Sequence, residues 1–505
     1  MARYKKSSHH TSEWTPTLLE KYDKSIAKIA AGYDLDTYPN QIEIISAEQM
    51  IDAYSSTGMP LGYAHWSFGK QFLNVEKNYK RGLMGLAYEL VINANPCITY
   101  LLEENTLPLQ ILVIAHACYG HNAFFKGNYL FKTWTTPDSI IDYLVFAKNY
   151  IFECEEKYGI DAVEEILDAC HALMKNGIDR YRRPSKLSLK EEKLRQTKRA
   201  EYLQTLVNEL WRTLPSSNNK KVAADEQFPS EPQENILYFV EKHAPLLEPW
   251  QREIVRIVRK MAQYFYPQQQ TKLMNEGWAT FWHYTIANQL FEEKQISDEC
   301  MLEILHNHTD VIYQPPFDNP FYHGLNPYTL GFNIFSDLRR ICENPTEEDK
   351  AWFPDIAGAN WIKVIDFAMR NFKDESFIAQ FLSPKVIRDL KLFSLIDDDQ
   401  RELVQVEAIH NEEGYQKIRQ ALSEQFSFSA QIPDIQIFRV DKRGDRSLTL
   451  RYTQRQRRSL DNAAHAVLSY LHTLWGFPIK LETLTEKGEI HLTASHPPAS
   501  STPSS

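Results

Sequence analysis

The sequence predicts a mainly α-helical protein with a small number of strands (α+β), made of a large helical N-terminal domain and a small β-β-α-β-β C-terminal domain. Apolar residues recur at helical spacing through most of the chain up to about residue 425. From about residue 431 the spacing changes to the alternation that is typical of strands. The chain has 505 residues, of which 43% are hydrophobic, and this is enough for more than one core.

The helical part begins near residue 14, after a basic, polar segment, 1–13, that we expect to be flexible. Residues 14–33 carry leucine, tyrosine and isoleucine at helical spacing. Residues 88–93, YELVIN, are the best early strand candidate, and residues 109–119 form an apolar helix after Pro108. Further helices are predicted at 137–158, 161–176, 249–266, 270–291, 335–342, 361–371, 375–381, 384–395 and 412–425, and another begins at 236.

Two segments interrupt these helices. A highly charged helix, 186–211, is followed by a polar stretch with three prolines, so a charged helix and linker occupy about 186–233 of the helical domain, 14–430. Residues 313–333 hold four prolines, two glycines and many aromatic residues. Because linkers lack anchoring aromatic residues, this second segment is predicted to be an ordered loop.

The C-terminal domain is predicted to span 431–494. Strands at 435–440 and 447–452 flank a glycine-containing turn, and a helix follows from Asp461, a good N-cap residue, to residue 474. Strands at 479–483 and 490–493 complete the β-β-α-β-β order. The tail, 495–505, is rich in serine and proline and is expected to be disordered.

Composition narrows the class of protein. The formal net charge is −10, which argues against an obligate nucleic-acid partner. No apolar run approaches the roughly 20 residues of a membrane span, and the basic N-terminus leads into no apolar signal segment. The six cysteines are scattered and form no CxxC pair, as expected for reduced thiols. We therefore expect a cytoplasmic protein.

Two short segments place metal-ligand residue types among apolar and aromatic neighbours, where a core normally excludes polar groups. Residues 114–128, IAHACYGHNAFFKGN, offer His116, Cys118 and His121, and residues 274–284, MNEGWATFWHY, offer Glu276 and His283. These are side chains that hold a buried transition metal. The alternative is that they make ordinary hydrogen bonds inside an aromatic core.

The spacing decides how these residues can cooperate. On a regular α-helix His116 and His121 diverge by about 140°, so they share a metal only if the helix ends or bulges between them, and Gly120 favours an end. Glu276 and His283 share a helix face but lie about 10.5 Å apart along the axis. We therefore predict His116, His121 and Glu276 as metal ligands. His283, Cys118, His65 and His323 are predicted to lie around them or to line a pocket.

At these positions the chain resembles the stage V sporulation protein R (SpoVR-like) family. The resemblance implies a role in spore-cortex formation or, in bacteria that do not sporulate, in stationary-phase or stress programmes. It also implies a link to a serine protein kinase whose gene often lies nearby, but it carries no biochemical activity and no catalytic residues. The segments that carry it are YAHWSFGK (63–70), YELVINANPCITYLLEEN (88–105), AHACYGHNAFFKGN (115–128), MNEGWATFWHY (274–284) and NPYTLGF (326–332).

A second, remote resemblance concerns the order of these segments. A strand, a helix bearing His116 and a later Glu276-Gly-Trp-Ala are similar to zinc metallopeptidases of the gluzincin type, in which two histidines and a later glutamate bind zinc. The chain departs from that pattern because Ala117 replaces the glutamate that acts as general base, and because the histidines are five residues apart. Two hypotheses result: a SpoVR-like protein that acts through interactions, or a metal-dependent hydrolase, with zinc as the metal, acting on peptide or cell-wall-related substrates.

Overall fold

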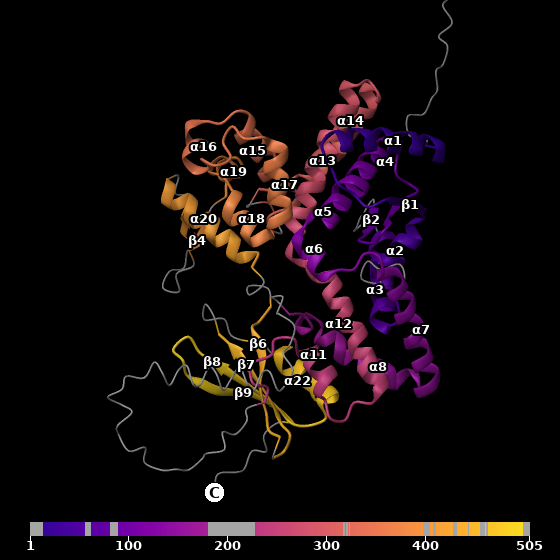
Figure 1. Ribbon diagram of the computed structural model, residues 1–505, viewed down its shortest axis with the longest axis vertical. Coiled ribbons are helices and arrows are strands. Elements are labelled where there is room, and N and C mark those ends of the chain that lie inside the picture. Colours follow the sequence, from indigo (N-terminus) through magenta and orange to yellow (C-terminus); the bar gives the residue numbers. More distant parts are fainter. Residues whose placement is uncertain are drawn as a thin grey trace, which may run out of the picture. The chain divides into compact units, whose positions relative to one another are not determined.

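The computed structural model contains two compact units, Met1–Glu164 with Gln263–Ile432, and Glu165–Ala262 with Pro433–Ser505. Helices dominate, with small sheets of three, two and four strands, and this confirms the predicted fold class (Figure 1). None of the described helices is long and apolar enough to cross a membrane. The described residues are 14–55, 62–80, 89–179, 228–316, 319, 322, 324–392, 394–396, 405–407, 411–427, 432–442, 444–454, 460 and 463–497.

The first unit contains a three-stranded sheet with the order β1-β3-β2. Strand β3 (Cys97–Leu102) pairs parallel with β1 (Asn40–Ile45) and antiparallel with β2 (Glu89–Ile92). Side chains of β3 alternate between buried and half-buried along most of the strand, as expected when one face of a sheet is covered. Of these strands, only β2 was predicted from the sequence.

The sheet is next to a continuous helical segment that changes its winding. It begins as α4 (Leu107–Ile114), where the Thr106 hydroxyl accepts the Leu109 N–H and Pro108 occupies the first turn. It continues as a π-helix, η1 (Ala115–His121), and ends as α5 (Asn122–Gly127). Every residue of η1 is buried. This segment contains both predicted histidine ligands.

Helix α13 (Lys272–Glu292) is the most deeply buried long helix of the unit and contacts η1 along its first half. The Asp374 carboxylate accepts the N–H groups of Leu273 and Met274 at 2.9 and 2.8 Å, so the first turn of α13 is capped from a distant part of the chain. Helix α15 (Pro327–Glu343) crosses α13 closely: a Cβ on Gly277 would lie 2.4 Å from the Gly331 Cα. Two glycines therefore allow backbone contact between these helices.

The first unit contains further elements, of which α15 to α20 lie close to one another in Figure 1. They are α1 (Pro16–Gly32), α2 (Ala47–Ser55), α3 (Trp66–Lys80), α6 (Tyr129–Trp134), α7 (Ile140–Tyr158), α14 (Asp298–Val311), α16 (Glu347–Trp352), α17 (Trp361–Asn371), α18 (Asp374–Phe381), α19 (Pro384–Asp389), β4 (Ser394–Ile396), β5 (Gln405–Glu407) and α20 (Glu412–Gln425).

The second unit is built on a four-stranded sheet of order β6-β7-β8-β9. Strands β7 and β8 are parallel and are connected by α22, which packs on β8 and β9, while the outer pairs are antiparallel, so the β-β-α-β-β prediction is confirmed. Gln233 pairs through its backbone with Ile437 of β6. The elements are most of α8 (Ile160–Ala172), η2 (Met174–Asn176), α11 (Ile236–His243), most of α12 (Pro249–Gln270), β6 (Ile435–Val440), β7 (Leu448–Thr453), α22 (Ala463–Trp475), β8 (Ile479–Leu484) and β9 (Ile490–His496).

Three local predictions need correction. The helix predicted at 384–395 is shorter, because α19 ends at Asp389 and strand β4 occupies Ser394–Ile396. The segment 313–333 is not a loop throughout, because α15 begins at Pro327, where the Asn326 side chain accepts the Tyr328 N–H and caps the helix. Gly120 does not end a helix, because helical structure continues into α5. The predicted charged helix, 186–211, and the terminal segments 1–13 and 498–505 lie outside the described residues.

Candidate metal centre

The π-helix brings His116 and His121 together, with ring centroids 4.6 Å apart. A π-helix closes its hydrogen bonds between residues i and i+5, so residues five apart lie on one face, whereas an α-helix would separate them by about 140°. The sequence required an end or a bulge between the histidines, and η1 provides the bulge.

Close packing explains the role of Gly120 within η1. A Cβ at this position would lie 2.6 Å from the Ala279 Cα, closer than non-bonded carbon atoms approach one another. The absent side chain therefore allows the backbone of η1 to lie against α13. This contact places the histidines of η1 beside Glu276, which is one turn before Ala279.

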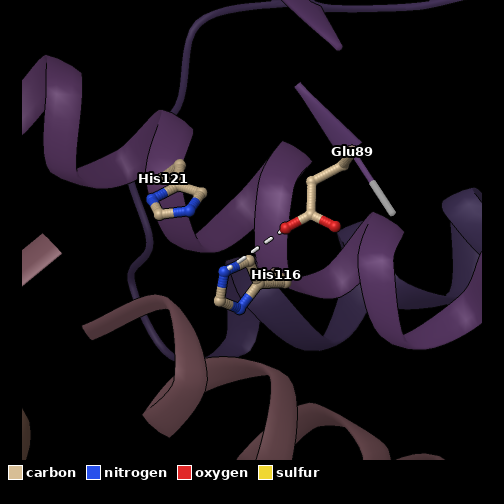
Figure 2. A group of neighbouring side chains, drawn as sticks. All are labelled: Glu89, His116 and His121. Atoms are coloured by element: carbon tan, nitrogen blue, oxygen red, sulfur yellow. Dashed lines mark ion pairs between the residues drawn. The ribbon is translucent and has the colours of Figure 1, made fainter. Parts of the chain in front are cut away.

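Four side chains converge at this contact. His116 Nε2 lies 3.7 Å from both Glu89 Oε1 and Glu276 Oε2, and His121 Nε2 lies 3.5 Å from Glu276 Oε2. Glu89, His116 and His121 each present one ligand atom within 4.8 Å of the other two, and Figure 2 shows these three side chains facing one another. A tetrahedral ion with bonds of about 2.0–2.2 Å holds its ligand atoms about 3.3–3.6 Å apart. The observed separations therefore suit one bound cation.

The electrostatics of the two carboxylates differ. Burial alone would raise the pKa of Glu276, but His116, His121 and Tyr328 hold it below its usual value. Burial raises the pKa of Glu89, and the nearby Glu276 adds to this, while His116 opposes it. Glu276 Oε2 is buried and has no hydrogen-bond partner among the described residues. An oxygen of this kind is costly to bury unless a cation occupies the space beside it.

Hydrogen bonds behind the histidines fix their orientation. His121 Nδ1 lies 2.9 Å from the Asn275 side-chain oxygen, which can only accept, so His121 carries its proton on Nδ1 and directs the Nε2 lone pair toward Glu276. His116 Nδ1 lies 2.9 Å from His283 Nδ1, and His283 Nε2 lies 2.8 Å from His308 Nδ1. Metal-binding histidines commonly engage their second nitrogen in this way.

Three of the buried histidines, His121, His283 and His308, favour their neutral form. Burial, with His116 nearby, lowers the pKa of His121 to about 4 and that of His308 to about 4. Burial also lowers the pKa of His283 well below its usual value, with His116 and His308 adding to the effect. Neutral imidazole is the form that binds a metal.

The structure places the other predicted site residues as follows. The Cys118 thiol lies 3.6 Å from the Thr99 hydroxyl of β3, and burial keeps its pKa well above the usual value, so it is held protonated. His65 is buried just before α3, with Nδ1 2.6 Å from the Ser67 hydroxyl. His323 lies outside the described residues.

Glu89 is the site residue that sequence reasoning missed. The signal was present, because Glu89 is the single charged residue in the predicted strand YELVIN. The sequence analysis predicts this segment only as a strand, and nothing in the sequence shows that β2 would contact η1. His308 was likewise missed as a neighbour of this centre, since it belongs to a different helix, α14.

Two family models match this chain and together cover most of its length. Residues 13–431 match the family described as SpoVR like protein, and residues 433–486 match the SpoVR-like C-terminal domain. The chain belongs to the SpoVR-like family. This confirms the resemblance found in the sequence.

A curated relative of this SpoVR-like chain is the uncharacterized protein YcgB of Escherichia coli strain K12. It is 60% identical over 487 residues, which cover 96% of each chain. No solved structure matches the chain. Family membership is thus established, while the chemistry must be argued from the site.

Proposed function

We propose that this protein is a metal-dependent hydrolase in which His116, His121 and Glu276 hold a divalent cation, with zinc as the first candidate. The observation that carries the proposal is the buried Glu276 Oε2, which has no hydrogen-bond partner among the described residues and lies 3.5 and 3.7 Å from two imidazole nitrogens. The substrates would be peptides or cell-wall-related amides, in keeping with the gluzincin-like order of strand, helix and later glutamate.

The donor set supports this assignment. The two carboxylates, Glu89 and Glu276, balance the charge of a divalent cation, which reduces the cost of burying it. Nitrogen and oxygen donors without thiolate suit zinc, iron or manganese. His121 already directs a lone pair inward because Asn275 accepts its other N–H.

Glu89 replaces the missing base of the gluzincin pattern. A bound zinc ion would polarise a substrate carbonyl and lower the pKa of a bound water. Glu89 approaches His116 Nε2 from β2, so it is positioned to accept a proton from a water in the same space. Glu89 therefore does the work that a glutamate at position 117 would do, although it comes from a different element.

The cellular setting follows from the family alone. We propose a role in an envelope, sporulation or stationary-phase programme, with a serine protein kinase system as a partner. If the protein binds no metal, the interaction-protein hypothesis replaces the hydrolase.

Elemental analysis of the full chain, purified without chelators, tests the metal site. We expect one zinc, iron or manganese ion per chain, and a marked loss of bound metal in Glu276→Gln and in His116→Ala. His306→Ala is the matched control, because the His306 side chain is 74% exposed on α14. Wild-type protein that holds no stoichiometric metal, and gains no thermal stability from added Zn²⁺, Fe²⁺ or Mn²⁺, would overturn the proposal.

The variant Glu89→Gln tests whether Glu89 is a general base or a metal ligand. We expect this variant to keep its metal and lose hydrolysis of the peptides or peptidoglycan fragments that the wild type cleaves, by about 10²–10⁴-fold in kcat. Loss of the metal from Glu89→Gln would instead make Glu89 a fourth ligand.

A further inference from the structure

Three buried histidines form a chain that leads away from the metal centre. His116 of η1, His283 of α13 and His308 of α14 are linked by nitrogen–nitrogen separations of 2.9 and 2.8 Å. His283 uses both of its ring nitrogens in this chain. His308 is 5% exposed, and its ring stacks on Tyr284 and meets the edge of Phe332. Three elements, η1 and the consecutive helices α13 and α14, thus share one hydrogen-bonded array.

The chemistry of imidazole limits this array to two arrangements. A neutral ring has one N–H donor and one lone-pair acceptor. If His116 donates from Nδ1, then His283 must accept at Nδ1 and donate from Nε2, and His308 must carry its proton on Nε2. If His116 accepts at Nδ1, both hydrogen bonds point the other way and His308 carries its proton on Nδ1.

We propose that His283 and His308 are positioning residues for His116, and that both hydrogen bonds of the chain reverse together when a divalent cation binds. This inference rests on the proposed metal site. Without a cation, His116 Nε2 faces Glu89 and Glu276 at 3.7 Å each, so a proton on Nε2 is favoured and His308 carries its proton on Nδ1. A cation needs the Nε2 lone pair, so His116 then donates from Nδ1 and the proton of His308 moves to Nε2.

The reversal conserves protons and charge. The cation displaces one proton from His116 Nε2, one proton moves along each of the two hydrogen bonds toward His116, and one proton enters at His308 Nε2 from solvent. The total number of protons on the three rings is therefore the same before and after. Burial lowers the pKa of His283 and of His308, which agrees with the neutral form of these two rings.

The histidine array orients the His116 ring for metal binding. In the cation-bound arrangement, His283 holds the His116 ring through an accepted N–H, as carboxylates and carbonyls do behind other metal-binding histidines. Removing that acceptor should weaken metal binding about 10–100-fold. At the far end of the histidine array, His308 Nε2 on α14 also changes from acceptor to donor. Binding of the cation therefore alters the hydrogen bonding of a helix that provides no ligand.

Nitrogen-15 NMR of histidine-labelled full-length protein tests the proposal. The chemical shifts of the two ring nitrogens identify the tautomer, and His308→Gln assigns the His308 signal. We expect His308 to be protonated on Nδ1 without metal and on Nε2 after one equivalent of Zn²⁺. The His306→Ala control should behave as the wild type does.

Two variants of His283 complete the test. His283→Leu should bind Zn²⁺ about 10–100-fold more weakly by calorimetry and should leave the His308 tautomer unchanged on binding. His283→Asn keeps a side-chain acceptor near the position of Nδ1, should fold more readily, and should recover part of the affinity. Bound Zn²⁺ with no change at His308 in the wild type would overturn this inference alone. No Zn²⁺ binding to the wild type would overturn the proposed function and this inference with it.

Discussion

Two glutamates, one in each unit, have opposite surroundings. Glu241 of α11 is 1% exposed at its side chain, and its oxygens accept from Lys242 at 2.7 Å, Arg256 at 3.1 Å and Arg259 at 2.9 Å. Glu276 of α13 has two imidazole nitrogens at 3.5 and 3.7 Å and a second carboxylate nearby. Lysine and arginine side chains of the protein neutralise Glu241, whereas no lysine or arginine among the described residues pairs with Glu276.

This difference separates a structural carboxylate from a binding one. Burial would raise the pKa of Glu241, but Lys242, Arg259 and Arg256 outweigh it and keep the carboxylate charged. The lowered pKa of Glu276 depends on His116, His121 and Tyr328, and burial favours the neutral form of His121. A charged Glu276 therefore lacks a permanent counter-ion, and an external cation is the simplest partner.

The largest expected effect is on Glu241. Glu241→Gln leaves Arg259 without its counter-charge and should lower the free energy of unfolding by about 3 kcal/mol. This is near the lower end for breaking a buried ion pair, because Arg256 reaches solvent and keeps Glu253 as a partner. Urea denaturation should show the same loss with and without added Zn²⁺. If the loss of unfolding free energy depended on Zn²⁺, Glu241 would not differ from Glu276 in the way proposed.

Glu276→Gln should behave differently. Without metal the amide loses the attraction of His116 and His121 but keeps an acceptor and a similar shape, so the free energy of unfolding should fall by far less than in Glu241→Gln. The wild type should gain about 2.7 kcal/mol when free Zn²⁺ is 100-fold above its dissociation constant, and the variant should lose most of this gain. Thermal and urea denaturation with a buffered metal series measure both effects. A metal-independent loss as large as that of Glu241→Gln would show that Glu276 is structural.

Gly120→Ala tests whether packing holds the π-helix against α13. The added Cβ would meet the Ala279 Cα at 2.6 Å, so we expect a loss of about 1–3 kcal/mol together with weaker metal binding. Gly32→Ala, at the end of α1, is the control, since a Cβ there meets nothing within 4 Å. Equal stability of the two variants would contradict the close approach.

The smallest expected effect is on pH dependence. Burial, and then His116, lowers the pKa of His308 to about 4, below the unfolded value of about 6.5. The stability contributed by neutral His308 is therefore present above about pH 6.5 and is lost as the pH falls toward 4, by at most about 1.4 kcal/mol per pH unit. His308→Gln should flatten this slope in metal-free protein, and His306→Gln should not. Urea midpoints between about pH 7 and pH 4 measure the slope, and an unchanged slope in His308→Gln would contradict the assignment.

Periodic, local patterns were predictable from the sequence, and contacts between distant elements were not. Strands β6 to β9 and α22 were found because alternation and helical spacing are properties of short segments. Strands β1 and β3 were missed, since short apolar runs do not distinguish a strand from a helix. The boundary of the C-terminal domain near residue 431 stays a prediction.

The residues of the candidate site also divide into those with a local sequence signal and those that depend on packing between distant elements. The clustering of His116, His121 and Glu276 in aromatic segments was enough to select them, and the structure brings all three together. Glu89 and His308 needed the packing of β2 and α14, for which the sequence carries no local signal. The winding of η1 was beyond prediction for a further reason: a π-helix depends on the surfaces around it more than on its own residues.

The winding of η1 also affects how such sites are recognised in sequences. Motif templates for helical metal sites assume ligands three or four residues apart, so a histidine pair separated by five does not match them. One additional residue in a helical turn changes the pattern from H-x-x-x-H to H-x-x-x-x-H and can keep the geometry of the pair. A template with one extra position, paired with a downstream glutamate in an aromatic helix, would find other proteins whose metal ligands lie on a widened turn.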